Sequence, residues 1–263
     1  MVGVVATCVI VLVLLLVCIV VMGTAWSRYV PALVAPRKTQ HQSELPRVFV
    51  INLDRRPDRR QAMAQKMAKA GIKHATFVKA VDGSTLRATP DITAMFRSHA
   101  TKRRGEIGCA LSHWGLWLAL AADPDPAATW AIFEDDVTFR DCFNAATDLT
   151  TSAPDVLRLL GYTTAGKSLP SKPETAPVPM NWADYWGGLF AYVLTRPVAR
   201  LLVAHIQVSG MVAALDNIVA QLKPCAEHVG SCESLSYHAA PAQRSGTTSD
   251  IQARHGTNDV LVM

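Results

Sequence analysis

Three adjacent acidic residues that directly follow an apolar run place the strongest constraint on this chain. The run is Trp130–Phe133, and the acids are Glu134, Asp135 and Asp136. Neighbouring carboxylates repel one another, so burying them together costs stability unless a cation lies among them. If the strand continues through the acids, Glu134 and Asp136 lie on one face and Asp135 on the other. We therefore predict a divalent-metal site held by Glu134 and Asp136, with a solvent-exposed acidic turn as the alternative.

Apolar runs of strand length alternate with helical patterns along the middle of the chain. We expect strands over Val48–Leu53, Ala75–Val81, Trp130–Phe133, Val156–Leu160 and Phe190–Leu194, and helices over 57–70, Glu106–Ala121, Pro197–Ile206 and Val212–Leu222. This alternation is typical of an α/β layer fold with a mainly parallel central sheet. Residues 161–183 hold four prolines between two of the strands, which indicates a long loop that is a lid, a binding loop or a disordered segment.

An uncharged apolar segment opens the chain. Residues 2–22 contain 15 Val, Ile or Leu residues, and at ~1.5 Å per residue they span about 31 Å, the thickness of a bilayer's hydrocarbon core. We expect a single-pass membrane protein, and a signal peptide cleaved near Gly23-Thr24-Ala25 is the alternative. The expected organisation is a transmembrane anchor at 1–22, a proline-bearing stem at 23–46, a folded domain at 47–251 and a tail at 252–263.

The sequence leaves open which side of the membrane the folded domain faces. Arg28, Arg37 and Lys38 follow the apolar segment and favour the cytoplasmic face, whereas a type II anchor would place the domain in a lumen. No Asn begins an Asn-x-Ser/Thr sequence, which weakens the lumenal interpretation. Cys225 and Cys232 are seven residues apart and could pair in an oxidising compartment, and no Cys/His spacing suggests zinc.

Basic residues cluster after the first expected strand. The net charge is +5, and four arginines lie at Arg55, Arg56, Arg59 and Arg60. A solvated helix face would explain them, and so would attraction of phosphate groups. Because aromatic residues do not interleave with the basic clusters, we do not expect nucleic acid as a partner.

The end of the first expected strand carries side chains suited to a nucleotide. Asn52 can hydrogen-bond a base or ribose, and Arg55 and Arg59 can bind a diphosphate through their planar guanidinium groups. An exposed helix face is the alternative for Arg59. His113 lies in an apolar helical stretch, where a histidine hydrogen-bonded within the core is more common than a ligand.

Four strings in fixed order resemble glycosyltransferase family 25, which includes lipopolysaccharide-type and collagen-type galactosyltransferases. They are INLDRRPDRR at 51–60, AVDG at 80–83, GEIGCALSH at 105–113 and FEDDV at 133–137. Weaker matches follow, among them Leu215-Asp216 and Ser249-Asp250-Ile251. Each string alone is weak, but together they make the resemblance specific over about residues 48–251.

The resemblance implies a GT-A fold, a nucleotide-binding α/β sandwich, with a UDP-sugar as donor and galactose as the sugar. The acids at 134–136 would take the place of that fold's metal-binding motif and hold a divalent cation, manganese. The residues expected to contact the donor are Asn52, Leu53, Arg55, Arg59, Glu134 and Asp135. An inverting transfer to a hydroxyl of a glycan or protein acceptor needs a base. Asp216 is the candidate, with Asp184 next, and a helix cap is the alternative role of Asp216.

Two other functions stay open at this point. One is a non-catalytic, membrane-tethered family member that serves as a binding partner. The other is a metal-dependent phosphoester hydrolase that uses the same acids, which is disfavoured because the chain lacks a second set of His and Asp ligands. Release of UDP with and without a sugar acceptor would separate these functions from a transferase.

Overall fold

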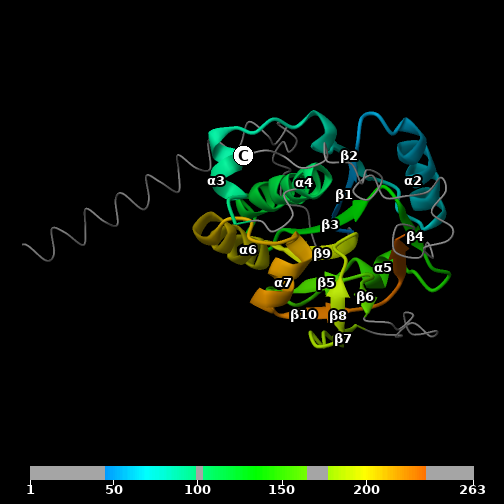
Figure 1. Ribbon diagram of the computed structural model, residues 1–263. Helices are drawn as coiled ribbons and strands as arrows, with labels where there is room; N and C mark the ends of the chain where they lie inside the picture. The colour runs from blue at the N-terminus through cyan, green and yellow to red at the C-terminus, as the bar shows by residue number, and fades with distance from the viewer. Residues whose placement is uncertain (1–44, 99–102, 165–176, 235–263) are drawn as a thin grey trace, which may run out of the picture.

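The computed structural model describes residues 45–98, 103–164 and 177–234, which form a mixed seven-stranded sheet with helices on both faces (Figure 1). The order of the strands across the sheet is β2-β1-β3-β9-β5-β10-β7. They are β1 (Arg47–Asn52), β2 (Thr76–Lys79), β3 (Thr129–Glu134), β5 (Leu157–Leu159), β7 (Val178–Pro179), β9 (Ala191–Thr195) and β10 (Ala226–His228). Two small antiparallel pairs flank the sheet: β4 (Val137–Phe139) with β11 (Cys232–Ser234), and β6 (Thr163–Thr164) with β8 (Tyr185–Gly187).

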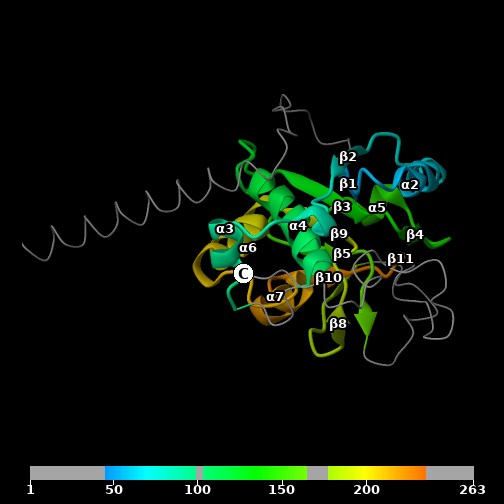
Figure 2. The same cartoon turned by 45° about the horizontal axis from the view of Figure 1, so that its top comes forward.

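The helices are divided between the two faces of the sheet. One face packs against α3 (Pro90–Met95), α4 (Arg104–Ala121), α6 (Arg196–Ser209) and α7 (Leu215–Leu222), and the other against α2 (Pro57–Lys69) and α5 (Ala145–Asp148). Alternation along β1 explains the division: Phe49 and Ile51 pack on the α4 side, and Val48 and Val50 on the α2 side. Helices α4 and α6 lie side by side (Figure 2).

The α/β fold expected from the sequence is confirmed, and the direction of the strands refines it. β1 is parallel to β2 and β3, and β10 is parallel to β5, whereas β9 is antiparallel to both β3 and β5. Five strands therefore run in one direction, and β9 and β7 run against them. The carboxyl ends of those five strands meet at one edge, where ligands bind in open α/β sheets.

Two local expectations are corrected. The strand that carries the acids does not continue through them: β3 ends at Glu134, a turn follows, and β4 starts at Val137. The last helix begins at Leu215 rather than at Val212. Part of the proline-rich loop forms the short strands β6 and β7, and its residues 165–176 lie outside the described residues.

The predicted membrane anchor lies outside the described residues. Where the structure describes the chain, no helix combines the length and the apolar character needed to cross a bilayer. Residues 1–44, with the anchor and most of the stem, and the tail at 252–263 are not among the described ranges. Cys225 is exposed and carries a free thiol, whereas Cys232 is buried.

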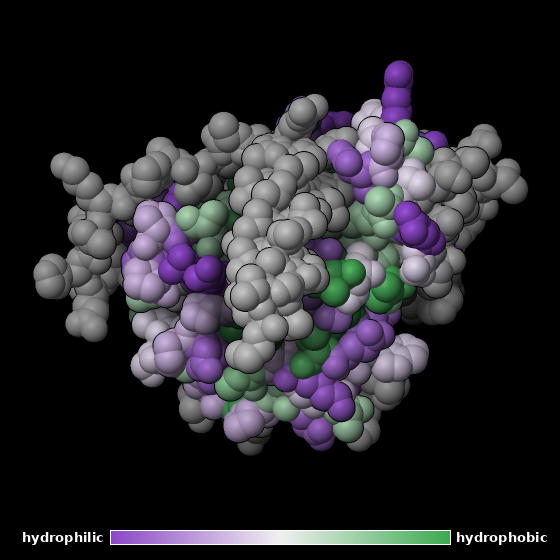
Figure 3. Space-filling model, turned by 90° about the vertical axis from the view of Figure 1, so that its left-hand side faces the viewer, coloured by the Kyte–Doolittle hydropathy of each residue, from purple (hydrophilic) through white to green (hydrophobic). Residues whose placement is uncertain are grey.

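One side of the molecule displays α3 and α6. On the described atoms of this face, hydrophilic and hydrophobic residues are interspersed (Figure 3). The exposed apolar side chains of α6 are Leu201 and Val208. Single exposed apolar residues among polar ones are ordinary on a solvated surface.

Candidate functional site

The acidic turn after β3 is held by residues from β1 and α2. The Asn52 side chain donates a hydrogen bond from Nδ2 to Oδ2 of Asp135 at 2.7 Å. Nη1 of Arg59 lies 2.9 Å from Oδ1 of Asp135 and 3.7 Å from Oδ2 of Asp136. Both aspartates are nearly fully buried. Asp135 and Asp136 therefore face the same guanidinium group, because a turn replaces the strand alternation expected here.

The hydrogen bonds and the ion pair at this turn do not fully offset the cost of burying its negative charges. Burial raises the pKa of Asp135 above its ordinary value, although the hydrogen bonds from Asn52 and Arg59 oppose the rise. Burial also raises the pKa of Glu134, and the charge of Asp136 adds to the effect. A further positive charge near these carboxylates would be favourable.

Glu134 ends a hydrogen-bonded chain that runs into the core. Nε2 of His113 lies 3.3 Å from Oε1 of Glu134, and Nδ1 of His113 lies 2.9 Å from the hydroxyl of Tyr192. Nε1 of Trp117 donates to the same hydroxyl at 2.8 Å. His113 is buried and has a partner on each ring nitrogen. The interpretation of His113 as a histidine hydrogen-bonded within the core fits this geometry.

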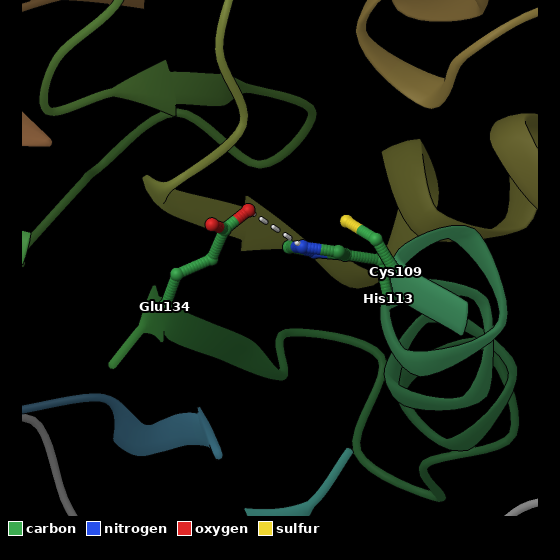
Figure 4. A group of neighbouring side chains, drawn as sticks. All are labelled: Cys109, His113 and Glu134. Atoms are coloured by element: carbon green, nitrogen blue, oxygen red, sulfur yellow. Dashed lines mark hydrogen bonds and ion pairs between the residues drawn. The ribbon is translucent and has the colours of Figure 1, made fainter. Parts of the chain in front are cut away.

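A thiol completes a group that the sequence reasoning missed. Cys109 and His113 project from α4, and Glu134 projects from the end of β3 toward them (Figure 4). The ligand atoms of these three residues all lie within 4.8 Å of one another. The spacing of four between Cys109 and His113, which puts both side chains on one helix face, was the available signal. The contribution of Glu134 comes from another element and has no signal in the sequence.

The segment with the string AVDG packs backbone to backbone against α4. A Cβ atom placed on Gly108 would lie 2.6 Å from the carbonyl oxygen of Val81, and one on Gly83 would lie 2.1 Å from that of Arg104. The side chain of Ser112 accepts a hydrogen bond from the backbone N–H of Val81. Glycine is required at both positions. The strings AVDG at 80–83 and GEIGCALSH at 105–113 therefore pack against each other through these two glycines.

A cavity of about 320 Å³ lies beside the carboxyl ends of β1 and β2. It is lined by Asp54, Arg55, Lys79, Ala80, Val81, Asp82 and Thr85. Nε of Arg55 donates to Oδ2 of Asp82 at 2.8 Å, and Lys79 pairs with Asp54. Burial pushes the pKa of Asp82 up, but hydrogen bonds from Ser84 and Arg55 outweigh it and hold that pKa below its ordinary value.

The residues expected to contact a donor thus fall into separate places. Arg55 lines the cavity, whereas Asn52 and Arg59 are engaged with the acidic turn. Leu53 is half-buried and packs against the core. Asn52 is the last residue of β1, and Arg59 lies in the first turn of α2.

Asp216 lies in the first turn of α7 and reaches the segment before β9. Its Oδ2 accepts a hydrogen bond from the backbone N–H of Gly188 at 3.2 Å, and Oδ1 accepts from the N–H of Asn217. The capping position of α7 belongs to Ala214, so Asp216 is not the N-cap residue. The alternative base, Asp184, is exposed and accepts a hydrogen bond from Asn181.

Carboxylates and a cavity lined by both acidic and basic side chains lie at the carboxyl ends of the strands of this α/β sheet, which is the edge where proteins of this class bind small ligands. The family model "Glycosyltransferase family 25 (LPS biosynthesis protein)" matches residues 45–218, more than half of the chain. The chain therefore belongs to glycosyltransferase family 25, as its four strings indicated.

Relatives from viruses and animals agree with this assignment. The chain is 33% identical over 169 residues to R655 of Acanthamoeba polyphaga mimivirus, named as a glycosyltransferase; the match covers 60% of this chain and 52% of R655. It is 36% identical over 118 residues to mouse "Inactive glycosyltransferase 25 family member 3", covering 41% of this chain and 19% of that protein. It is 33% identical over 115 residues to "Procollagen galactosyltransferase 1-A" of Xenopus laevis, covering 40% and 18%. The chain thus spans about half the length of R655 and less than a fifth of the two animal proteins.

Proposed function

We propose that this chain is a metal-dependent, inverting glycosyltransferase that moves galactose from UDP-galactose to a hydroxyl of a glycan or protein acceptor. The observation that carries the proposal is the meeting of carboxylates, basic side chains and a cavity at the carboxyl edge of the sheet in a family 25 chain. The sheet with helices on both faces supports the further assignment to the GT-A fold.

The cavity beside β1 and β2 is the proposed place for the donor nucleotide. Its size suits a small ligand, and Arg55 and Lys79 supply positive charge along its wall. Asp54 and Asp82 now pair with these two cations, and a diphosphate would compete for them. In this arrangement Asn52 and Arg59 fix the acidic turn, and Arg55 is the arginine available to the donor.

Glu134 and Asp136 are the proposed ligands of a divalent cation, manganese. Both residues supply carboxylate oxygens, which are the ligand atoms that manganese and related hard cations prefer. The raised pKa of Glu134, caused by burial and by the charge of Asp136, is the environment that a cation would relieve. When bound, the cation would neutralise the diphosphate as the glycosidic bond breaks.

Asp216 is the proposed base that takes the proton of the acceptor hydroxyl. Its carboxylate accepts hydrogen bonds from backbone N–H groups on both oxygens, which holds it in one orientation. Gly187 leaves room beside it: a Cβ atom there would lie 2.6 Å from Oδ2 of Asp216. Space beside a fixed carboxylate is what an incoming hydroxyl needs.

The names of some relatives favour one other function, a non-catalytic family member. Four of the related animal proteins, including the mouse protein, are named as inactive or probable inactive. A catalytically silent chain would keep the donor cavity and lose turnover. The membrane anchor at 2–22 is part of the proposal in either case and would tether the domain.

Nucleotide-sugar turnover tests the proposal. The full chain in detergent is incubated with UDP-galactose, UDP-glucose or UDP-N-acetylglucosamine, with manganese or with chelator, and with a panel of glycan and peptide acceptors. We expect UDP release that depends on manganese, is fastest with UDP-galactose and rises with one class of acceptor. Donor binding without any release would favour the non-catalytic function.

A further inference from the structure

We propose that Cys109, His113 and Glu134 form a binding site for zinc, and that zinc at this site inhibits sugar transfer by withdrawing Glu134 from the catalytic cation. The inhibitory part rests on the proposed function, whereas the binding part stands on the geometry of the three side chains alone. Thiolate, imidazole and carboxylate are the three ligand types that zinc takes in proteins. Manganese prefers oxygen ligands, so the thiol separates the two cations chemically.

The spacing of the ligand atoms is close to that of a tetrahedral zinc site. Nε2 of His113 and Oε1 of Glu134 are 3.3 Å apart. Zinc bonds of about 2.0–2.2 Å to nitrogen and oxygen place two tetrahedral ligands about 3.3 Å apart. With a Zn–S bond of about 2.3 Å, the sulfur belongs about 3.6 Å from the other two ligands. All ligand atoms lie within 4.8 Å of one another, so the sulfur has to approach the other two ligand atoms by no more than about 1.2 Å.

The hydrogen-bond partners of His113 in the core allow its Nε2 atom to be unprotonated, as metal binding requires. For Nε2 to bind zinc, the ring proton must lie on Nδ1, which is 2.9 Å from the hydroxyl of Tyr192. A hydroxyl oxygen has two lone pairs, so Tyr192 can accept the N–H of Trp117 and that of His113 together. Partners of this kind fix the ring and its tautomer in metal sites.

The charge around the thiol favours a cation. The pKa of Cys109 is well above its ordinary value because of burial and because Glu134, Asp216 and Asp136 are negative. Zinc reverses the effect, because a coordinated thiol loses its proton outright. The side chain of Glu134 is 28% exposed, which leaves one side of the site open to solvent and to a fourth ligand.

Cobalt binding tests the site without any need for activity. The full chain in detergent is freed of metal with chelator and titrated with Co²⁺, and thiolate coordination appears as a sulfur-to-cobalt charge-transfer band. We expect that band in the wild type and in the control Cys142→Ser, whose position is exposed and is not part of the group of ligand atoms. Cys109→Ser should lose the band. Zinc should displace cobalt and bleach it.

Zinc affinity measured by competition gives a second, graded result. Loss of an outer partner costs roughly 10–100-fold in metal affinity, so Tyr192→Phe should weaken zinc by about tenfold, and Cys109→Ser by more than Tyr192→Phe. Equal zinc affinity in the wild type and Cys109→Ser would overturn the site. If Cys109→Ser fails to fold, alkylation of the wild-type protein tests the site instead. We expect zinc to protect Cys109 from alkylation. Alkylation of Cys109 at the same rate with and without zinc would contradict the proposal.

The inhibitory part has its own readout. At fixed manganese, added zinc should lower UDP release by the wild type and by Cys142→Ser, and Cys109→Ser should resist. If the cobalt band forms but zinc leaves turnover unchanged, the binding site stands and the competition for Glu134 is refuted. If no variant releases UDP at all, the proposed function fails while the cobalt result still decides the site.

Discussion

Arg59 is the residue on which the acidic turn depends most. Its guanidinium group is the partner of both Asp135 and Asp136, and its side chain is only 16% exposed. Carboxylates that are buried without a cation are strongly destabilising. The positive charge of Arg59 offsets the negative charges of the two buried aspartates, and its removal would leave them without that compensation.

Arg59→Gln should lower the free energy of unfolding at pH 7 by about 3 kcal/mol, the lower end for a broken buried pair. The lower end applies because Lys66 also lies close enough for its charge to interact with Asp136. The loss should shrink as the pH falls. Burial already raises the pKa of Asp135, and removal of Arg59 raises it further. Above about pH 4, the native state of the variant therefore binds more protons than its unfolded chain, so the stability of the variant increases as the pH falls.

Urea unfolding at pH 7 and pH 5 measures this effect. Arg60→Gln is the matched control, because Arg60 is exposed on the same helix and contacts the ring of Phe77. A loss for Arg59→Gln that is equal at both pH values, or equal to that of the control, would contradict the account of the turn.

Asp216→Asn should lower the transfer rate by ~10²–10⁴ and leave donor affinity nearly unchanged, because a base acts on the acceptor hydroxyl. The amide keeps an oxygen that can accept the backbone N–H of Gly188, so the fold should be preserved. Turnover and titration with UDP measure the two effects separately. A normal turnover number would make Asp216 a structural residue and direct attention to Asp184.

At the scale of elements, α4 organises the site. It carries Cys109 and His113 on the side of Glu134, and Gly108 on the side of the segment 80–83. Since that segment lines the cavity, the position of α4 fixes the cavity wall. A change in the packing of α4 should therefore be felt in ligand binding as well as in stability.

Gly108→Ala should destabilise the fold by about 1–3 kcal/mol and weaken donor binding, because its Cβ atom would force the backbone of Val81 and Gly83 aside. Ala119→Ser is the control, since it adds one atom at a half-buried position of the same helix. Thermal unfolding and UDP titration provide the readouts. Unchanged donor binding in a folded Gly108→Ala variant would show that α4 does not set the cavity wall.

Asp82→Asn should cost about 1 kcal/mol of stability at pH 7, because hydrogen bonds to a charged carboxylate are lost. The pKa of Asp82 is lowered in the folded state, so its contribution is present above about pH 4 and disappears as the pH falls through the lowered pKa. Asn retains the oxygen that accepts the N–H of Ser84. The difference in stability between variant and wild type should thus be larger at pH 7 than at pH 3 in unfolding curves, and a constant difference would refute the assignment.

At the scale of the whole molecule, hydrophobic periodicity predicted the layers of the fold. Five of the strands and the long helices lie where apolar runs and 3.6-residue patterns placed them, because burial dictates both. The antiparallel β9 could not be predicted, since a short apolar run carries no sign of its direction. The shared contact of Asp135 and Asp136 with Arg59 depends on where β3 ends, and the pairing of β3 with β1 extends to Glu134, opposite Ile51. The approach of Glu134 to Cys109 depends on how α4 packs on the sheet.

The central claim is that a cation held by Glu134 and Asp136 joins a UDP-sugar to this domain. Calorimetric titration of UDP-galactose into the full chain in detergent, with manganese or with chelator, tests it most directly. The account predicts binding that requires manganese, that is lost in Asp136→Asn and Glu134→Gln, and that persists in the exposed control Cys142→Ser. Binding of equal strength without metal, or undiminished in Asp136→Asn, would contradict it.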